Sequence, residues 1–311
     1  MKRKLIRFSV VFSLIVMLLL LPVVFKEKDH PALVGPDLSE VDYSEIFFKN
    51  RHENLQLSGM LFLPEGEGPF PTAVIIHGSG TSRRNNVWYI SVAHHLQQHG
   101  IAVLLPDKRG SEKSEGEWLG ASFEELATDT VSAVEFVKHQ QMFEYSTIGL
   151  LGMSQGGWIA PVVAAKTEDV SFIVSMSGAA VTTEEQLLHE EIYNIDPYTY
   201  TFLAKLIAPI SSGILMKKDF FIPTAEFDPI PYWKDVHVPV FFALGGNDKN
   251  VPVDASIRRL KENNLNHFTM KIYPDGGHAI RDIQTNKVNE EFLNDLVKFI
   301  KEVKQAGLSE K

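Results

Sequence analysis

The stretch STIGLLGMSQGGWIA, residues 146–160, joins an apolar run to a helix-like segment through a glycine-rich turn. Ser154 lies in that turn, with Gly152 two residues before it, Gly156 two residues after it, and Gly157 next. A serine nucleophile needs a sharp turn at the end of a strand, and small neighbours make room for that turn. The pattern also fits a simple bend between a strand and a helix, so it leaves both interpretations open.

Strand-like and helix-like segments alternate on both sides of this turn. Two alternating stretches at 45–50 and 54–66 are joined by a polar turn and indicate an antiparallel start. Continuous apolar runs then predict strands at 72–78, 101–107, 146–152, 171–178, 238–246 and 268–277. Helical spacing predicts helices near 87–98, 122–140, 155–166, 253–263 and 287–305. This order predicts an α/β fold with a mostly parallel central sheet and helices on both faces.

The alternation is interrupted between residues 181 and 236, where acidic helix-like pieces, aromatic residues and prolines occur. We expect a small helical lid at 181–236, inserted before the strand at 238–246. The core then comprises residues 43–180 and 237–311, and the polar segment 26–42 is a linker. The lid aromatics favour an apolar acyl or alcohol group in the substrate, although ordinary packing within the lid also explains them.

An acid and a base for Ser154 follow two later strands. Asp248 lies in the loop GGND after the strand at 238–246, and His278 lies in the loop DGGH after the strand at 268–277. His267 precedes its strand and therefore lies at the wrong end of the sheet. Sites in such sheets collect at the carboxyl ends of the strands. The order Ser154, Asp248, His278 predicts a catalytic triad, with glycines 276 and 277 leaving the imidazole room to move.

The oxyanion of an acyl-transfer intermediate needs two backbone N–H donors. Gln155, directly after the nucleophile, is expected to supply one of them. The loop HGSG at 77–80 is expected to supply the other, from Ser79 in the first place and Gly80 in the second. His77 is expected to order this loop through hydrogen bonds and not to act as a base.

The chain resembles the α/β-hydrolases in five motifs, HGSG, PDKRGSEKS, GMSQGG, GGND and GGH, which occur in family order between residues 45 and 305. It is most similar to the bacterial esterase and serine-aminopeptidase-like branch. The segment DKRGSEKSEG resembles a D-x-R-G-x-G-x-S turn but has Glu112 at the second glycine. The resemblance implies that Ser154 attacks an acyl carbon, His278 moves the proton and Asp248 orients the imidazole. It also implies structural roles for Asp107 and Arg109.

The leading functional hypothesis is hydrolysis of carboxylic esters with small to medium acyl chains. The alternatives are a prolyl or aminopeptidase-like peptidase, an acyltransferase or thioesterase, and a catalytically silent membrane-tethered binding module. A peptidase needs a site for the amino terminus of its substrate, for which the lid offers Glu184, Glu185, Glu190 and Glu191. No cofactor or metal motif is present, and a net charge of −9 without a basic stripe argues against nucleic acid as a partner. The oligomeric state stays open.

The N-terminus predicts a route out of the cytoplasm. Lys2, Arg3, Lys4 and Arg7 precede an uncharged run at 8–25, which as a helix would be about 27 Å long. Residues 1–25 are therefore expected to be a signal anchor or a cleaved signal peptide, and the basic residues favour a cytoplasmic N-terminus. The rest of the chain is expected to be extracytoplasmic, either tethered to the membrane or secreted.

Overall fold

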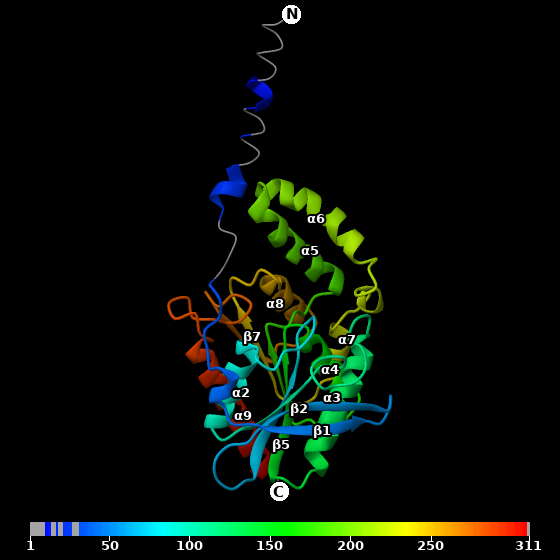
Figure 1. Ribbon diagram of the computed structural model, residues 1–311, viewed down its shortest axis with the longest axis vertical. Helices are drawn as coiled ribbons and strands as arrows, with labels where there is room; N and C mark the ends of the chain where they lie inside the picture. Colours follow the sequence, from blue (N-terminus) through cyan, green and yellow to red (C-terminus); the bar gives the residue numbers. More distant parts are fainter. Residues whose placement is uncertain (1–9, 14–16, 18–20, 27–30, 310–311) are drawn as a thin grey trace, which may run out of the picture.

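The computed structural model describes residues 10–13, 17, 21–26 and 31–309, and it is built around one eight-stranded sheet (Figure 1). The order of the strands in the sheet is β1-β2-β4-β3-β5-β6-β7-β8. Their bounds are β1 Ser44–Asn50, β2 Leu55–Phe62, β3 Phe70–Ile76, β4 Ala102–Pro106, β5 Tyr145–Met153, β6 Phe172–Met176, β7 Val240–Gly245 and β8 Thr269–Tyr273. β1 pairs antiparallel with β2, β2 pairs antiparallel with β4, and every later pairing is parallel. The predicted mostly parallel sheet with an antiparallel start is thus confirmed.

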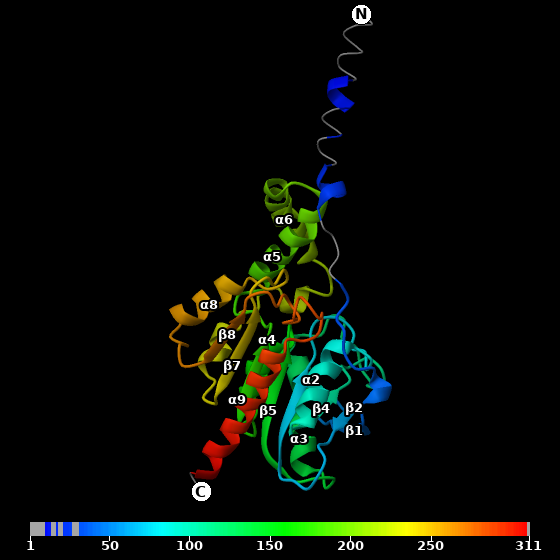
Figure 2. The same cartoon turned by 90° about the vertical axis from the view of Figure 1, so that its left-hand side faces the viewer.

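Helices cover both faces of the sheet, as the sequence predicts. α2 (Val87–Gln98) and α9 (Glu290–Ser309) bury their apolar sides on one face, which is turned to the viewer in Figure 2. α3 (Phe123–His139), α4 (Gly156–Ala164) and α8 (Val253–Glu262) pack on the other face. A capping box starts α3, because the Ser122 side chain accepts from the Glu125 N–H and the Glu125 carboxylate accepts from the Ser122 N–H.

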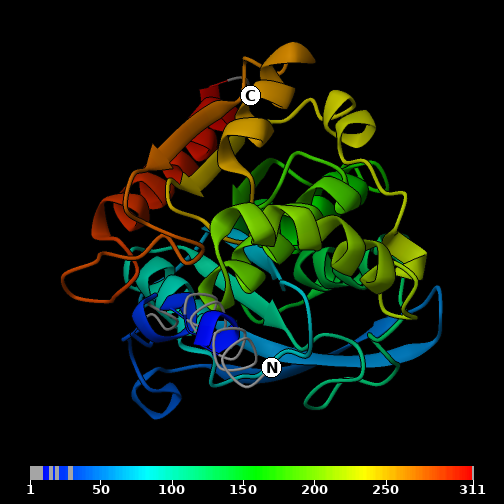
Figure 3. The same ribbon diagram turned by 90° about the horizontal axis from the view of Figure 1, so that it is seen from above.

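The chain between β6 and β7 forms helical elements. They are α5 Thr183–Ile195, η2 Asp196–Tyr198, α6 Thr201–Leu215, η3 Ile222–Thr224 and α7 Ile230–Lys234. Of these, α5 and α6 lie beyond the carboxyl ends of the parallel strands and α7 lies beside α4 (Figure 1). Figure 3, seen from above, shows α5 and α6 side by side on top of the molecule. The boundaries of a lid at 181–236, and its role as a lid, stay predictions.

The aromatic residues of this insertion do not form one substrate-facing surface. Phe227 packs edge-on against Phe123 of α3, at 4.6 Å between ring centroids, and Trp233 is fully buried 4.8 Å from Phe242 of β7. Phe202 of α6 faces outward and is 67% exposed. These contacts favour the alternative of ordinary packing for Phe227 and Trp233, because composition does not reveal which way each ring points.

The predicted signal peptide or anchor at 1–25 lies largely outside the described residues. In the part of the chain that the structure does describe, no helix is both long enough and apolar enough to cross a membrane. Lys26, just after the apolar run, forms an ion pair with Asp196 of η2, with 2.8 Å between Nζ and Oδ2. The chain therefore enters the described domain beside the helices of the insertion.

Asp107 and Arg109 have structural partners, in agreement with the expectation. The Asp107 carboxylate accepts hydrogen bonds from the Arg84 guanidinium and the Ser58 hydroxyl. The Arg109 guanidinium is only 3% exposed and pairs with Glu53 and Asp129, at 2.7 Å each. These contacts join the turn after β4 to the start of the sheet and to α3.

Arg109→Met is expected to lower the free energy of unfolding by about 3 kcal/mol, because it leaves the Asp129 carboxylate, which is only 14% exposed, without its cation. Urea denaturation followed by tryptophan fluorescence measures the change. Lys113→Met is the matched control. Lys113 pairs with Glu45, but its side chain is 55% exposed, so solvent screens this ion pair. Equal effects of the two substitutions would contradict the role assigned to Arg109.

Candidate active site

Ser154 occupies a strained turn between β5 and α4. Its φ angle is +56°, a left-handed conformation that is costly for a residue with a side chain. The glycines allow this turn: a Cβ atom on Gly152 would lie 2.2 Å from the Gly156 carbonyl oxygen, and one on Gly156 would lie 2.2 Å from the Ile76 carbonyl oxygen. A Cβ atom on Gly157 would lie 2.6 Å from the Ser175 hydroxyl. Close backbone packing therefore fixes the serine at the end of the strand.

The structure brings together the three side chains predicted to form the triad, those of Ser154, Asp248 and His278. His278 Nε2 lies 2.9 Å from Ser154 Oγ, and His278 Nδ1 lies 2.9 Å from Asp248 Oδ2. Since the carboxylate can only accept, Nδ1 carries the proton, and Nε2 is left to accept from the serine hydroxyl. The imidazole is thus oriented as a base toward Ser154.

The Asp248 carboxylate is fixed from two sides. Its side chain is fully buried, and Oδ1 accepts from the backbone N–H groups of Asn250 and Val251 at 2.8 and 3.0 Å. The loop after β7 therefore holds the carboxylate through its own backbone, and His278 Nδ1 approaches both carboxylate oxygens, Oδ2 at 2.9 Å and Oδ1 at 3.1 Å.

The glycines before His278 lie where the histidine loop meets the aspartate loop. A Cβ atom on Gly245, at the end of β7, would lie 1.9 Å from the Gly277 carbonyl oxygen, so the two loops are in backbone contact. Gly277 has a φ angle of +56°, and a Cβ atom on Gly276 would lie 3.0 Å from the Ile280 Cα atom. The absence of a side chain at Gly245 therefore lets the histidine loop lie tightly against the aspartate loop, while the space beside Gly277 is open within 4 Å, and the expectation that Gly276 and Gly277 leave the imidazole room to move stays a prediction.

The two expected oxyanion donors lie on the two loops nearest Ser154. Gln155 is the N-cap of α4, and within the described part of the chain neither its backbone N–H nor that of Ser79 has an acceptor. The Gly78 N–H is engaged, because it donates to the Tyr89 hydroxyl at 2.8 Å. A Cβ atom on Gly78 would lie 3.1 Å from the Ser154 Cβ atom, so the loop approaches the nucleophile closely. The assignment of Ser79 and Gln155 as donors stays a prediction.

His77 and Lys108 hold the oxyanion loop from beneath. His77 Nε2 bonds the Pro106 carbonyl at 2.7 Å, and burial lowers the pKa of the imidazole to about 4, so it is neutral. The Lys108 ammonium donates to the Gly78 carbonyl and, at 2.9 Å, to the Gly80 carbonyl. Burial lowers the pKa of Lys108 to about 8. The sequence analysis missed Lys108, although it lies inside the quoted PDKRG motif.

Lys108→Met is expected to lower kcat about 10²-fold with little change in KM, because the loop that carries Ser79 loses two hydrogen bonds and shifts. The wild-type kcat should fall as pH rises through about 8, where Lys108 loses its charge. The variant should lack this step. Stability changes in the opposite direction: the folded pKa lies below the ordinary 10.5, so the free energy of unfolding rises with pH between these values. A variant that kept the wild-type profile would contradict the role of Lys108 as a positioning residue.

A cavity of about 700 Å³ lies beside the triad. Asp248 and His278 form part of its wall, and Tyr193 of α5 is the aromatic residue that borders it among the described residues. Its charged lining side chains are those of Asp248, Lys249, Asp275 and Arg281. The cavity wall thus combines these charged side chains with apolar ones such as Leu33 and Ile283.

The four acids of the insertion lie in different environments. Glu184 is exposed, Glu185 belongs to the capping box of α5, and the buried Glu191 accepts from Ser211 and Asn194. Glu190 accepts from the Asn250 side chain at 3.3 Å, and burial raises the pKa of its carboxyl, which also feels the charges of His278 and Asp248. Glu190 is therefore the one of these four that lies close to the triad.

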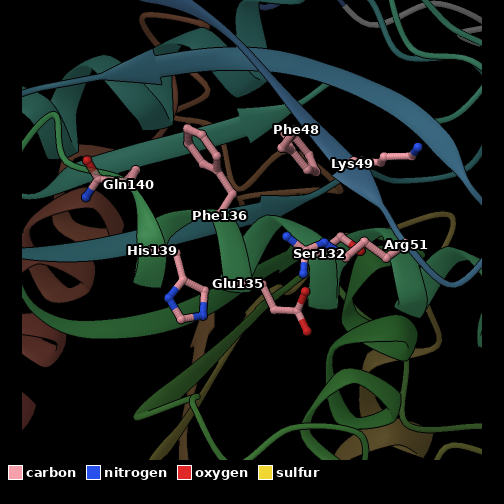
Figure 4. Close-up of a pocket in the computed structure, with 8 residues that line it drawn as sticks. All are labelled: Phe48, Lys49, Arg51, Ser132, Glu135, Phe136, His139 and Gln140. Atoms are coloured by element: carbon pink, nitrogen blue, oxygen red, sulfur yellow. The ribbon is translucent and has the colours of Figure 1, made fainter.

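A second hollow lies away from the triad. Figure 4 shows it between β1 and α3, with a volume of about 400 Å³ and lined by residues such as Phe48, Arg51, Glu135 and His139. β1 is the outer edge strand, separated from β5 by β2, β4 and β3. This hollow therefore plays no part in the chemistry at Ser154. Among the described residues there is also no group of three or more side chains suited to hold a metal ion.

Two protein families match parts of the chain. Residues 131–282 match the C-terminal region of BAAT and acyl-CoA thioester hydrolases, and residues 53–206 match the X-Pro dipeptidyl-peptidases of family S15. Among curated proteins, esterase EstD of Thermotoga maritima is 28% identical over 213 residues, covering 63% of this chain and 50% of the relative. The human acylamino-acid-releasing enzyme is 26% identical over 257 residues, covering 78% and 34%. The chain thus spans half or less of the length of these relatives.

Solved structures share the fold. Esterase Pf2001 of Pyrococcus furiosus superposes with a TM-score of 0.65 at 20% identity, covering 89% of this chain and 98% of that one. Est1E of Butyrivibrio proteoclasticus, solved with ferulic acid bound, gives a TM-score of 0.57 at 18% identity, covering 85% and 99%. At such identities the similarity establishes the fold alone, and the chemistry is inferred from the geometry of the site.

Proposed function

We propose that this chain, which belongs to the esterase- and peptidase-like α/β-hydrolases, is a serine hydrolase that cleaves carboxylic esters of small to medium acyl chains. One observation carries the proposal: His278 bridges Ser154 and Asp248 at 2.9 Å on each side, at a serine held with a φ angle of +56°. A purely structural turn has no need of a strained serine in contact with a histidine that pairs with a buried carboxylate.

The geometry supports the following sequence of steps. Ser154 Oγ attacks the acyl carbon while His278 Nε2 takes its proton, and the N–H groups of Ser79 and Gln155 bind the oxyanion. His278 then protonates the leaving alcohol, and the acyl group stays on Ser154. Water attacks this acyl-enzyme with His278 again as base, which releases the acid and restores the serine hydroxyl. Asp248 stabilises the imidazolium in both steps.

Ester hydrolysis is tested by comparing p-nitrophenyl acetate, butyrate and palmitate with acyl-CoA thioesters and with aminoacyl and prolyl p-nitroanilides. We expect the highest kcat/KM on acetate or butyrate, because the cavity beside the triad is of moderate size and charged side chains interrupt its apolar wall. A higher kcat/KM on an anilide or a thioester would reverse the assignment of the substrate class, while the serine mechanism would stand.

A peptidase is the second candidate, and Glu190 favours it. A carboxylate near the triad can bind the amino terminus of a peptide as an ion pair. If the chain is a peptidase, Glu190→Gln lowers kcat/KM for aminoacyl anilides and leaves the hydrolysis of p-nitrophenyl butyrate unchanged. Equal effects on both substrates would remove Glu190 from amine recognition.

We also propose that the hydrolase domain is extracytoplasmic, tethered by residues 1–25 or released after their cleavage. The basic residues before the uncharged run support this proposal. The mass of the mature protein from its native membrane or medium distinguishes the two forms. A full-length chain found in the cytosol would exclude both.

A further inference from the structure

α6 presents its large apolar side chains outward and its small ones inward. The side that packs on α5 has buried small residues spaced four residues apart, namely Ala204, Ala208 and Ser212. The opposite side, here called the α6 outer face, is made of Phe202, Leu206, Ile207, Ile210 and Ile214, and three of these, Phe202, Leu206 and Ile210, are 67%, 68% and 66% exposed. A helix on the surface of a water-soluble domain has the reverse pattern. Such a continuous apolar face indicates an interaction surface.

The charged side chains within residues 197–218, the segment that includes α6, are all positive, and Asp196 and Asp219 flank this segment. Residues 197–218 contain Lys205, Lys217 and Lys218 and no aspartate or glutamate, although the whole chain has a net charge of −9. All three lysines are exposed. An apolar stripe accompanied by lysines is typical of helices that lie in the interface of a bilayer, where long side chains reach the headgroups.

The position of α6 in the molecule fits the same partner. Figure 1 shows α6 at the end of the molecule from which the N-terminal segment leaves, and Lys26 pairs there with Asp196, five residues before α6 begins. The uncharged run 8–25 ends immediately before Lys26. Leu21, Val24 and Phe25, the described apolar residues of that run nearest to Lys26, are exposed as well. Two apolar surfaces therefore occur side by side at one end of the chain.

We propose that the α6 outer face docks on an anionic lipid bilayer, with its apolar side chains among the upper acyl chains and its lysines at the headgroups. A second copy of the chain fits less well, because a symmetric pairing of two such faces brings the three lysines of one copy near those of the other. The docking goes beyond the proposed ester hydrolysis, since it depends on neither the triad nor the cavity.

The absence of cysteine from the chain permits a direct test with single labels. The full chain carrying Ile210→Cys is labelled with the environment-sensitive fluorophore NBD and mixed with phosphatidylglycerol–phosphatidylcholine vesicles that contain nitroxide-labelled lipids. Met142→Cys is the matched control, because Met142 is apolar and 51% exposed but precedes β5, at the opposite end of the sheet. Thermal unfolding establishes that both labelled chains are folded.

We expect the label at 210 to shift its emission to the blue and to be quenched by the nitroxide lipids, and the label at 142 to show neither effect. Quenching should be weaker in vesicles of phosphatidylcholine alone, because the lysines then lack anionic headgroups. An unquenched label at 210 on vesicle-bound chain would overturn the docking, as would a stable dimer in sedimentation that protects position 210. Turnover of p-nitrophenyl butyrate in the same samples reports the proposed chemistry separately.

Discussion

Ser154→Ala is expected to lower kcat on p-nitrophenyl butyrate at least about 10⁴-fold, with the fold intact. The hydroxyl that His278 Nε2 contacts at 2.9 Å is the atom that bonds the acyl carbon, and alanine offers no replacement. Stopped-flow measurement of the p-nitrophenol burst checks the prediction, because the burst reports formation of the acyl-enzyme. The variant should also fail to react with a fluorophosphonate probe.

Ser154→Gly provides the matched control for folding. Glycine adopts a φ angle of +56° without strain. The Ser154→Gly variant should therefore be as inactive as Ser154→Ala, but its free energy of unfolding should be about 1 kcal/mol higher than that of Ser154→Ala. Ser79→Ala is the control for chemistry, because it keeps the backbone N–H that is assigned to the oxyanion. A Ser154 variant with wild-type turnover, or a Ser79 variant as inactive as Ser154→Ala, would contradict the mechanism.

The parts of the fold that depend on local pattern could be predicted from the sequence. The runs at 72–78 and 146–152 are apolar and short, and strands buried on both faces have that pattern. The loops with Asp248 and His278 follow strands whose carboxyl ends must share one edge of a parallel sheet. The order of the strands along the chain was therefore enough to predict that Ser154, Asp248 and His278 lie at one edge of the sheet, although it does not give the distances between them.

Features that depend on contacts between distant segments could not be predicted. Lys108 contacts the oxyanion loop because β4 lies next to β3, and spacing along the chain contains no sign of that contact. The outward direction of Phe202 depends on which side of α6 packs on α5, and both sides of the helix are largely apolar by composition. The tight contact between Gly245 and Gly277 likewise appears only when β7 and β8 are paired.

The insertion between β6 and β7 could likewise be predicted from the sequence, whereas its contacts could not. Prolines and a change in rhythm indicated an insertion between two strands, but they do not say what the insertion faces. In the structure, Trp233 completes the core behind β7 and Tyr193 borders the cavity beside the triad. The role of each aromatic residue depends on its position in the fold and not on its residue type. The substrate must therefore be inferred from the lining of the cavity.

Asp248→Asn is expected to lower kcat about 10⁴-fold while the structure stays intact. The amide oxygen of asparagine can keep accepting from the backbone N–H groups of Asn250 and Val251. Its NH₂ group then faces His278 Nδ1 and forces that nitrogen to accept a hydrogen bond. The proton moves to Nε2, which donates to Ser154 and can no longer take the hydroxyl proton.

The prediction is checked by the rate of fluorophosphonate labelling and by the burst of p-nitrophenol, both of which require a basic Nε2. Both should fall together in the variant, because the defect precedes the acyl-enzyme. Asp254→Asn, in the exposed first turn of α8, is the control and should label at the wild-type rate. A wild-type burst in Asp248→Asn followed by slow release would place the role of Asp248 in deacylation alone. A wild-type rate in both phases would show that the buried carboxylate does not set the tautomer of His278.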